Sequence, residues 1–296
     1  MTKFTQETVV AADLSGDAAM SAAVVDGADL HCMLARILFP SISYLSDEEI
    51  VANHKDKRNA SKAPRFAMSY GGNAFTIHMN EGIPLKRAQE IEDGFKELHA
   101  GLYEWGDKVF QEAIKKGYIE SADGWKLALP KFTKFREYKA KVEALTKEEW
   151  QKYKQGKLEY KKKQEEAEKN IVYVYKFPKA VTFYNSKKSE VKQFFKLKSE
   201  YQRLCLNSPV QSRSAHQLKL ATCILFDWIV ENNLINQVLI VNAVHDELVV
   251  ECKEHYELLV RDKVQEAMLE GGNYYLKTLK IKAEAAIGDN WYSAKG

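Results

Sequence analysis

Cysteines are few in this sequence, and none form the pairs that hold a zinc ion or build a disulfide framework. The four cysteines, Cys32, Cys205, Cys223 and Cys252, are scattered over 296 residues without a CxxC spacing, which is typical of a reducing compartment. No apolar run approaches the roughly 18 residues that a membrane helix needs. The first residues, MTKFTQETVV, lack the basic and apolar regions of a secretory signal. We therefore expect a cytoplasmic protein with no membrane partner.

The composition is that of a folded chain rather than a disordered one. Hydrophobic residues make up 45% and aromatic residues 11% of the sequence, which is enough apolar material for packed cores. A length of 296 residues fits about two domains. No internal repeat and no linker rich in Pro, Gly or Ser marks where one domain would end.

Charge is unevenly distributed along the sequence. Residues 131–200 hold 20 Lys and Arg against 10 Asp and Glu, a net charge of +10, whereas the other residues hold 24 against 31, a net charge of −7. A basic segment on an acidic body is typical of a binding site for a polyanion. A solvated helical insertion would show the same pattern.

Hydrophobic periodicity predicts an α+β fold. Apolar runs predict strands at 7–13, 171–177, 237–244, 247–252 and 279–286, and a hairpin at 117–130. Helical spacing covers 28–39, 47–70, 84–116 with a break near Gly101, 134–170, 187–203, 209–231 and 254–270. Two of the predicted strands, far apart in the chain, end in acids.

These two acids are the first candidate site. Asp13 ends the predicted strand 7–13, and Asp246 lies between two apolar runs in the sequence His245-Asp246-Glu247. Buried unpaired charge is costly, and two acids brought together repel each other unless cations lie between them. Two Mg²⁺ ions about 4 Å apart, held by carboxylate oxygens, are the usual device for phosphoryl displacement. Two unrelated turn acids are the simpler alternative.

Between the two acids lies a four-residue ladder, Arg58-x3-Lys62-x3-Phe66-x3-Tyr70, followed by Gly71. Steps of four residues keep side chains on one face of a helix. Two cations next to two aromatic rings fit a nucleoside triphosphate, with the cations on the phosphates and the rings against sugar and base. A second ladder, Arg203-x3-Asn207-x3-Gln211, places polar groups where a helix can contact DNA, although ordinary surface polarity also explains it.

Taken in order, the motifs resemble those of the family A (DNA polymerase I-like) DNA polymerases. The segments that carry the resemblance are VVAADLS (9–15), GADLHCMLARILF (27–39), RNASKAPRFAMSYGG (58–72), RLCLNSPVQ (203–211), VHDELVVE (244–251) and IGDNW (287–291). They resemble motif A, the helix after it, the motif B fingers helix, the template-primer helix, motif C and the C-terminal tail. The resemblance covers nearly the whole chain except about 134–198.

The resemblance implies a palm, an antiparallel sheet with helices, and a helical fingers subdomain, with the thumb and the exonuclease absent. The implied domains are 1–45, the first part of the palm; 46–130, the fingers with their motif B helix at 58–72; 131–200, a basic insertion within or next to the fingers; and 201–296, the second part of the palm with motif C at 245–247. We expect the insertion to contact DNA.

The implied activity is that of a DNA-directed DNA polymerase, which adds a dNTP to a primer 3′-OH and releases pyrophosphate. The implied residues are Asp13, the Leu14 carbonyl and Asp246 as ligands of two Mg²⁺ ions; Glu247 and Lys62 as further catalytic groups; His31, Arg58, Lys62, Phe66 and Tyr70 for the nucleotide; and Arg203, Asn207, Gln211 and His245 for DNA. The implied partners are primer-template DNA, dNTPs and an N-terminal polymerase fragment with the thumb and exonuclease.

Two departures from the family pattern bear on the site. The family follows its motif A aspartate with a Glu that gates the sugar 2′-OH, but here Ala18 falls at that position, and Asp17 is the nearest acid. Pro64 lies inside the predicted fingers helix, where proline removes a hydrogen bond and costs about 3 kcal/mol in a regular interior.

Two alternatives remain open at the level of the sequence. A catalytically impaired, DNA-binding remnant of a family A polymerase would keep the same ladders. A single-subunit RNA polymerase would share the strand-end aspartates and the Lys…Tyr-Gly helix, but Phe66 and Glu247 favour the DNA enzyme. The split appearance and the insertion suggest a phage-type enzyme, working in a bacterial or phage-infected cell.

Overall fold

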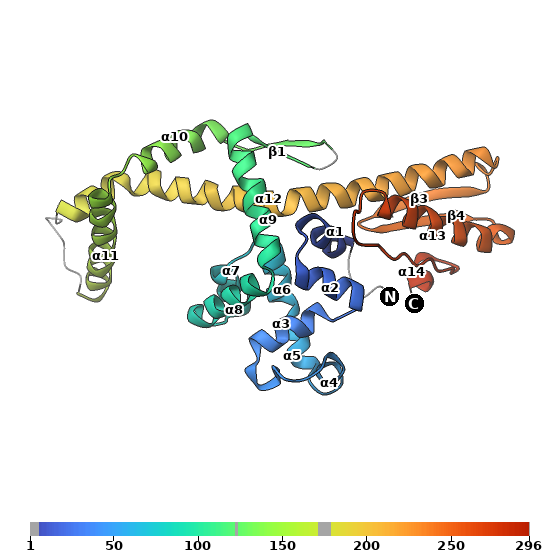
Figure 1. Cartoon of the computed structure of the whole chain (residues 1–296), viewed down its shortest axis with the longest axis horizontal. Helices are drawn as coiled ribbons and strands as arrows, with labels where there is room; N and C mark the ends of the chain where they lie inside the picture. Colours follow the sequence, from blue (N-terminus) through green and yellow to red (C-terminus); the bar gives the residue numbers. More distant parts are fainter. Residues whose placement is uncertain (1–5, 122–123, 171–178, 296) are drawn as a thin grey trace. The chain divides into compact units, whose positions relative to one another are not determined.

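The computed structural model describes residues 6–121, 124–170 and 179–295, and the chain forms two compact units (Figure 1). Unit 1 comprises residues 1–127 and 203–296, and unit 2 comprises residues 128–202. The fold is mostly helical with two small antiparallel sheets, so the α+β prediction is confirmed. No helix in the described ranges is long and apolar enough to span a membrane.

The elements are, in chain order, α1 (Gln6–Ser15), α2 (Ala18–Asp26), α3 (Leu30–Leu38), η1 (Pro40–Ile42), α4 (Asp47–Asn53), α5 (Lys55–Ala60), α6 (Lys62–Ser69), α7 (Ala74–Glu81), α8 (Leu85–Leu98), α9 (Ala100–Lys116), β1 (Tyr118–Glu120), β2 (Lys126–Ala128), α10 (Phe132–Glu143), α11 (Lys147–Asn170), α12 (Lys179–Glu231), β3 (Val238–Val244), β4 (Glu247–Cys252), η2 (Glu254–Tyr256), α13 (Glu257–Asn273) and α14 (Trp291–Lys295).

The first predicted strand is wrong, because residues 7–13 belong to helix α1. Its apolar run is too short to distinguish a strand from a buried helix by pattern alone. Val9, Val10 and Ala12 are buried on this helix, and the Gly16 N–H closes its last turn on the Ala12 carbonyl at 2.9 Å. Motif A, as the resemblance assigns it, therefore does not form a strand here.

The predicted helix 47–70 is divided into α4, α5 and α6. The break before α6 explains how Pro64 is accommodated. Because α6 begins at Lys62, Pro64 lies in its first turn, where backbone N–H groups have no partner within the helix. Arg58 and Lys62 consequently lie on two consecutive helices rather than on one.

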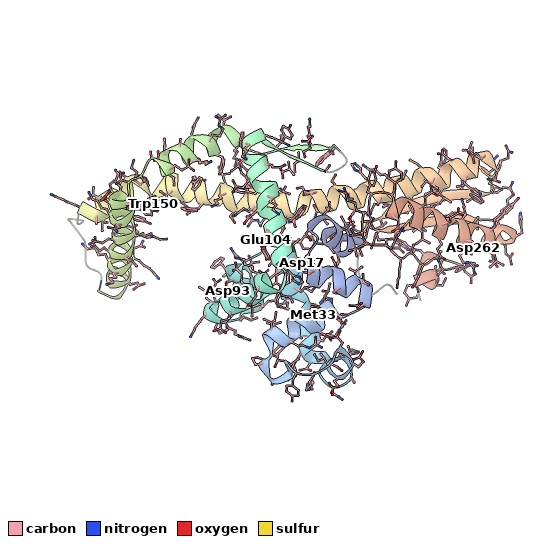
Figure 2. All side chains as sticks on the ribbon, in the orientation of Figure 1. Asp17, Met33, Asp93, Glu104, Trp150 and Asp262 are labelled. Atoms are coloured by element: carbon pink, nitrogen blue, oxygen red, sulfur yellow. The ribbon has the colours of Figure 1, made fainter. Side chains whose placement is uncertain are left out.

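Helix α6 packs against neighbouring helices through a buried apolar cluster. Leu34 and Leu38 of α3, Met68 of α6, Ile77 of α7 and Phe95 of α8 are members of one buried cluster. The predicted break in 84–116 is found at His99, between α8 and α9. Asp17, labelled in Figure 2, contacts this break.

The hairpin predicted at 237–252 is confirmed. Strands β3 and β4 pair antiparallel with Val244 opposite Glu247, and His245 and Asp246 form the turn between them. Leu225 and Ile229 of α12, Val238 of β3 and Val260 of α13 form the core beneath the hairpin. Figure 1 shows α13 and the C-terminal part of α12 beside this small sheet.

The final predicted strand, 279–286, is wrong, because the structure gives this segment no regular secondary structure. Two of its backbone donors are bound by side chains instead of a neighbouring strand. The Leu279 N–H donates to Asp13 at 3.2 Å, and the Ile281 N–H donates to the Asn273 side chain at 2.8 Å.

Unit 2 is helical and has its own aromatic core. Phe135 of α10 stacks on Phe194 of α12 at 5.6 Å between ring centroids and meets Tyr201 edge-on at 4.8 Å. Trp150 of α11, labelled in Figure 2, packs on Tyr153. The predicted helix 134–170 is divided into α10 and α11, whereas 187–203 and 209–231 are parts of the single helix α12, with Pro209 inside it. The predicted strand 171–177 lies outside the described residues.

Candidate functional site

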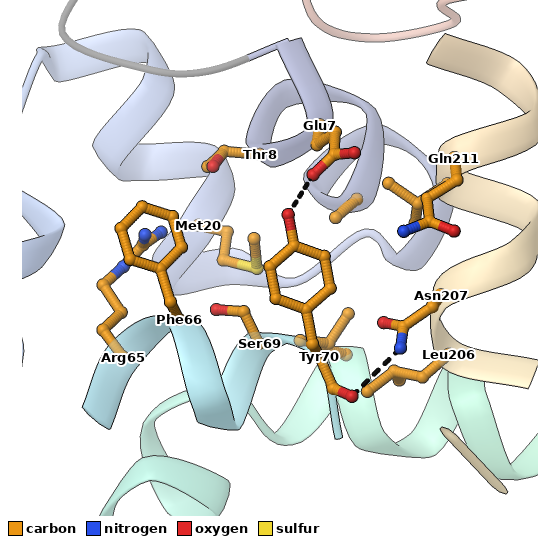
Figure 3. Close-up of a pocket in the computed structure, with 13 residues that line it drawn as sticks. Glu7, Thr8, Met20, Arg65, Phe66, Ser69, Tyr70, Leu206, Asn207 and Gln211 are labelled. Atoms are coloured by element: carbon orange, nitrogen blue, oxygen red, sulfur yellow. Dashed lines mark hydrogen bonds between the residues drawn. The ribbon is translucent and has the colours of Figure 1, made fainter. Parts of the chain in front are cut away.

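A pocket in unit 1 brings the two sequence ladders together. The space between its lining residues is about 500 Å³ when the open solvent at its mouth is included. Phe66 and Tyr70 line it from the end of α6, and Asn207 and Gln211 line it from α12 (Figure 3). Residues predicted to bind a nucleotide therefore share one pocket with residues predicted to bind DNA.

Tyr70 is held at both ends in this pocket. Its hydroxyl donates to the Glu7 carboxylate of α1, and its backbone carbonyl accepts a hydrogen bond from the Asn207 amide at 3.0 Å (Figure 3). Burial and the hydrogen bond to Glu7 raise the pKa of Tyr70 to about 12. Tyr70 is therefore neutral at pH 7. Its two hydrogen bonds connect the end of α6 with α1 and α12.

Three cationic side chains, Arg58, Lys62 and Arg65, lie near His31 at the N-terminal end of α3. Arg58 donates from its Nε atom to Asp29 at 2.7 Å, and its Nη2 atom lies 2.6 Å from the same oxygen. Burial and the neighbouring charge of Arg65 lower the pKa of His31 to about 4, with Arg58 and Lys62 contributing in the same direction. His31 is therefore neutral at pH 7, and three cations surround it.

The ladder residues of this cluster differ in their exposure. The Phe66 ring lies 6.0 Å from the His31 ring and is 42% exposed. Lys62 is exposed, so its ammonium can reach a ligand, whereas Arg58 is already paired with Asp29. The structure thus places His31, Arg58, Lys62 and Phe66 in one region.

The second ladder packs directly against the end of α6. Gly71, with φ of +74°, follows Tyr70, and a Cβ atom there would lie 2.9 Å from Cγ of Arg203. Only glycine fits this combination of a left-handed backbone and close approach. Arg203, Asn207 and Gln211 therefore occupy successive turns of α12 along the motif B segment.

Asp13, which the sequence predicted as a metal ligand, is hydrogen-bonded to the C-terminal segment of the chain. Its carboxylate accepts hydrogen bonds from the backbone N–H groups of Lys277 at 3.0 Å, Thr278 at 2.7 Å and Leu279 at 3.2 Å, and from the Thr278 hydroxyl at 2.9 Å. Burial raises its pKa, but these hydrogen bonds outweigh burial, and the pKa lies below its ordinary value. Four donors reach Oδ1, whereas the only hydrogen bond to Oδ2 among the described residues is the one shared from the Lys277 N–H at 3.1 Å. Asp13 thus anchors the C-terminal segment, and its role as a metal ligand together with the Leu14 carbonyl stays a prediction.

The motif C residues lie where the sequence placed them, at the hairpin turn. His245 has φ of +54°, and both His245 and Asp246 are exposed. Glu247 accepts a hydrogen bond from the Trp291 indole at 2.9 Å, which ties motif C to the tail segment. No group of three or more His, Cys, Asp or Glu side chains that could hold a metal occurs in the described part of the chain. The pairing of Asp13 with Asp246 around two metal ions stays a prediction.

Sequence reasoning missed Glu7, the acid that faces the motif B tyrosine. Asp17, the acid nearest to the expected position of the sugar-gating Glu, is 1% exposed and makes its hydrogen bonds within the fold. It caps α2 by accepting from the Met20 N–H at 2.8 Å, and it lies 3.2 Å from Nδ1 of His99. The signal available in the sequence for Glu7 was an acid just before the apolar run 8–12.

Sequence reasoning also missed Arg65, which lies beside Phe66 on α6. Arg65 lines the pocket but is only 6% exposed, and its Nε atom has no hydrogen-bond partner among the described residues. Burial lowers its pKa to about 10, against the effects of Asp29 and Tyr70. The guanidinium remains charged at pH 7.

Comparison of structures shows the class of fold. The chain is similar to a solved structure described as the POL domain of Pol1 from M. smegmatis in complex with DNA primer-template and dNTP, with a TM-score of 0.65 and 19% identity, over 99% of this chain and 39% of that one. At this identity the similarity shows the fold alone, which is that of a polymerase domain.

The family follows from the sequence match. Residues 4–293 match the family model of DNA polymerase family A, and the chain belongs to that family. It is 25% identical to DNA polymerase I of Streptococcus pneumoniae over 98% of this chain and 25% of that protein, and 24% identical to the thermostable DNA polymerase I of Thermus aquaticus over 98% and 26%. It is 37% identical to the DNA polymerase of Mycobacterium phage D29 over 41% of this chain and 19% of that protein.

The chain thus spans about a quarter of the length of these DNA polymerase I relatives. The match is to a DNA polymerase family, and the alternative of an RNA polymerase receives no support from it. The regions predicted as palm and fingers both overlap the matched range 4–293.

Proposed function

We propose that this chain is the palm and fingers part of a DNA-directed DNA polymerase, which binds a dNTP and primer-template DNA. One observation carries the proposal. Tyr70 of the predicted nucleotide ladder and Asn207 of the predicted DNA ladder are 137 residues apart, yet they are joined by a hydrogen bond of 3.0 Å inside one pocket. Template-directed synthesis needs this adjacency, because the incoming nucleotide must pair with a template base.

The nucleotide would bind along α6. Lys62, which is exposed at the start of this helix, would neutralise the charge that develops on the leaving pyrophosphate. The rings of Phe66 and Tyr70 would pack on sugar and base. Glu7, bonded to the Tyr70 hydroxyl, would serve as the acid that senses the sugar 2′-OH.

DNA would bind along α12 and the hairpin turn. Arg203, Asn207 and Gln211 would contact the duplex through backbone and groove atoms, and His245 would lie near the primer end. Base pairing rather than side-chain readout would select the nucleotide. Primer-template DNA and dNTPs are accordingly the partners we propose, together with an N-terminal polypeptide that supplies a thumb.

Catalytic groups in this proposal come from motif C and α6. Asp246 and Glu247 present carboxylate oxygens at the turn, and oxygen ligands of this type suit Mg²⁺. Asp13 accepts hydrogen bonds from residues 277–279 mainly through Oδ1, and its Oδ2 atom would supply a further carboxylate oxygen to the ions. We therefore assign Asp246, Glu247 and Lys62 to catalysis.

A second candidate function is favoured by the hydrogen bonds of Asp13. If Asp13 acts only within the fold, motif C is left without its predicted partner acid, which fits a DNA-binding domain without catalysis. The two candidates share the pocket and differ only in whether Asp246 acts on a substrate.

Primer extension separates the two. The chain is assayed with a labelled primer-template, dNTPs and Mg²⁺, alone and with the polypeptide encoded immediately upstream. Extension that the Asp246→Ala variant abolishes, and that the Asp227→Ala variant of an exposed acid on α12 retains, supports the polymerase. Duplex binding without extension in both preparations supports the DNA-binding domain.

A further inference from the structure

Beside the pocket lies a buried guanidinium, that of Arg65, with no ion pair to an acid among the described residues. Arg65 is 6% exposed, and its Nε atom has no hydrogen-bond partner among the described residues. Buried charges in proteins are normally paired or hydrogen-bonded, because an unpaired one is costly. Arg65 therefore carries a binding capacity that the fold itself does not use.

The neighbouring charges show what kind of group would satisfy it. The negative charge of Asp29 favours the charged form of Arg65. Asp29 is, however, already bound by Arg58 through two guanidinium nitrogens. Tyr70 is neutral at pH 7 because its pKa is raised to about 12. Around neutral His31, Arg58, Lys62 and Arg65 outnumber the carboxylate of Asp29 by two charges, and one positive charge remains in excess when Glu7 of the pocket lining is counted as well. A ligand that matches this excess is a polyanion.

The position of Arg65 fits an anion that enters through the pocket. Arg65 and Phe66 are adjacent on α6 and both line the cavity (Figure 3). Lys62 is three residues earlier, on the same side of the helix. A guanidinium fork binds phosphate oxygens with two parallel hydrogen bonds, which an ammonium group cannot do.

We propose that Arg65 is a further nucleotide-binding residue, whose guanidinium donates to phosphate oxygens of a nucleoside triphosphate held along α6. The inference rests on the proposed function and adds to it a cation outside the Arg58, Lys62, Phe66 and Tyr70 ladder. It also gives a reason for burying this charge: the cost in the free protein is relieved when the triphosphate binds, so binding is favoured over the empty state.

The test is a pair of binding titrations by calorimetry, with dTTP and with inorganic tripolyphosphate as probes. We expect Arg65→Gln to weaken binding of both probes by about tenfold to hundredfold, the range of a charge-assisted hydrogen bond. Arg261→Gln, which neutralises an arginine of α13 outside the pocket, is the matched control and leaves both affinities unchanged.

Thermal unfolding without ligand distinguishes binding from a structural role. We expect Arg65→Gln to keep or raise the melting temperature, since it removes an unsatisfied buried charge. A lowered melting temperature together with unchanged affinities would show a structural role and overturn the inference. If Arg65→Gln does not fold, Arg65→Lys, which keeps the charge but loses the fork, should bind both probes several-fold more weakly, and unchanged affinity would contradict the proposal.

The outcomes also separate this inference from the proposed function. If the wild-type chain binds dTTP and Arg65→Gln binds it equally well, Arg65 is not a ligand and the polymerase proposal stands. If tripolyphosphate binds through Arg65 but dTTP does not bind, Arg65 binds anions but not nucleotides, and both the inference and the polymerase proposal fail. If neither probe binds the wild-type chain, both are wrong.

Discussion

Among single residues, two acids make contacts that the sequence did not predict. Asp13, which the sequence favoured as a metal ligand, is a buried acceptor for three consecutive backbone N–H groups. Glu7, which sequence reasoning passed over, contacts the motif B tyrosine. Both roles follow from contacts that no local pattern reveals, since the partners of Asp13 are 264 to 266 residues away.

Replacing Asp13 tests its structural role. We expect Asp13→Asn to lower the free energy of unfolding at pH 7 by about 2–3 kcal/mol without any metal present, because hydrogen bonds to a charged acceptor are lost. The pKa of Asp13 is lowered in the fold. Its stabilisation is therefore present above the unfolded-state pKa of about 3.9 and is lost as the pH falls through the folded-state value.

Urea denaturation at pH 7 and near pH 3 measures this effect. The difference between wild type and Asp13→Asn should shrink at the lower pH, while Asp26→Asn, at an exposed position, should match wild type at both. Equal stability of wild type and Asp13→Asn at pH 7 would contradict the anchoring role.

Among helices and strands, the sequence predicted those whose signals are local. The hairpin β3–β4 was found because two apolar runs flank a two-residue polar turn, and register is then determined by that turn. Helix α3 was predicted over 28–39 from its spacing and from Pro40 after it, and the structure adds Asp29 as its N-terminal cap. The strand predicted at 279–286 does not form, and the cause is not local in the sequence. The side chains of Asp13 and Asn273 bind two of its backbone N–H groups.

The turn after α6 is the element that joins the two ladders, and glycine makes it possible. We expect Gly71→Ala to destabilise the chain by about 1–3 kcal/mol, since it forces a left-handed residue with a Cβ atom against Arg203. Gly82→Ala is the matched control, with φ of +67° and nothing within 4 Å of its Cβ position. Its cost should be only the backbone part, about 1 kcal/mol.

Thermal or urea unfolding of both variants gives the comparison. Gly71→Ala should also weaken primer-template binding, because Arg203 must shift to make room, whereas Gly82→Ala should leave DNA binding unchanged. If both variants lose the same stability and bind DNA equally, the close packing of the motif B end on α12 is not important.

For the molecule as a whole, charge alone predicted a separate basic segment. Unit 2, residues 128–202, covers nearly the range predicted as an insertion, and many of its lysines are exposed. The sequence could not show that one helix, α12, would run through both units. Pro209 lies inside this helix, where proline usually ends or kinks a helix, and a helix of 53 residues is far longer than the usual range.

Neutralising exposed lysines of α11 tests whether unit 2 contacts DNA. We expect Lys154, Lys157 and Lys162, replaced together by glutamine, to weaken duplex binding. The slope of log affinity against log salt should decrease by up to about 0.9 for each phosphate that is no longer neutralised. The same change at Lys86, Lys108 and Lys115, exposed lysines of unit 1, should have a smaller effect. Equal effects of the two triple variants would favour a solvated insertion instead.

The proposed polymerase function requires that the pocket between α6 and α12 holds a nucleotide opposite a template base. This is measured by equilibrium binding of each dNTP to a complex of the chain with a primer-template whose primer ends in a dideoxynucleotide, so that no chemistry is required. We predict that the dNTP complementary to the template base binds at least about tenfold more tightly than the other three, a difference of about 1.4 kcal/mol, and that changing the template base changes the preferred dNTP. Equal affinity for all four, whatever the template base, would contradict this function.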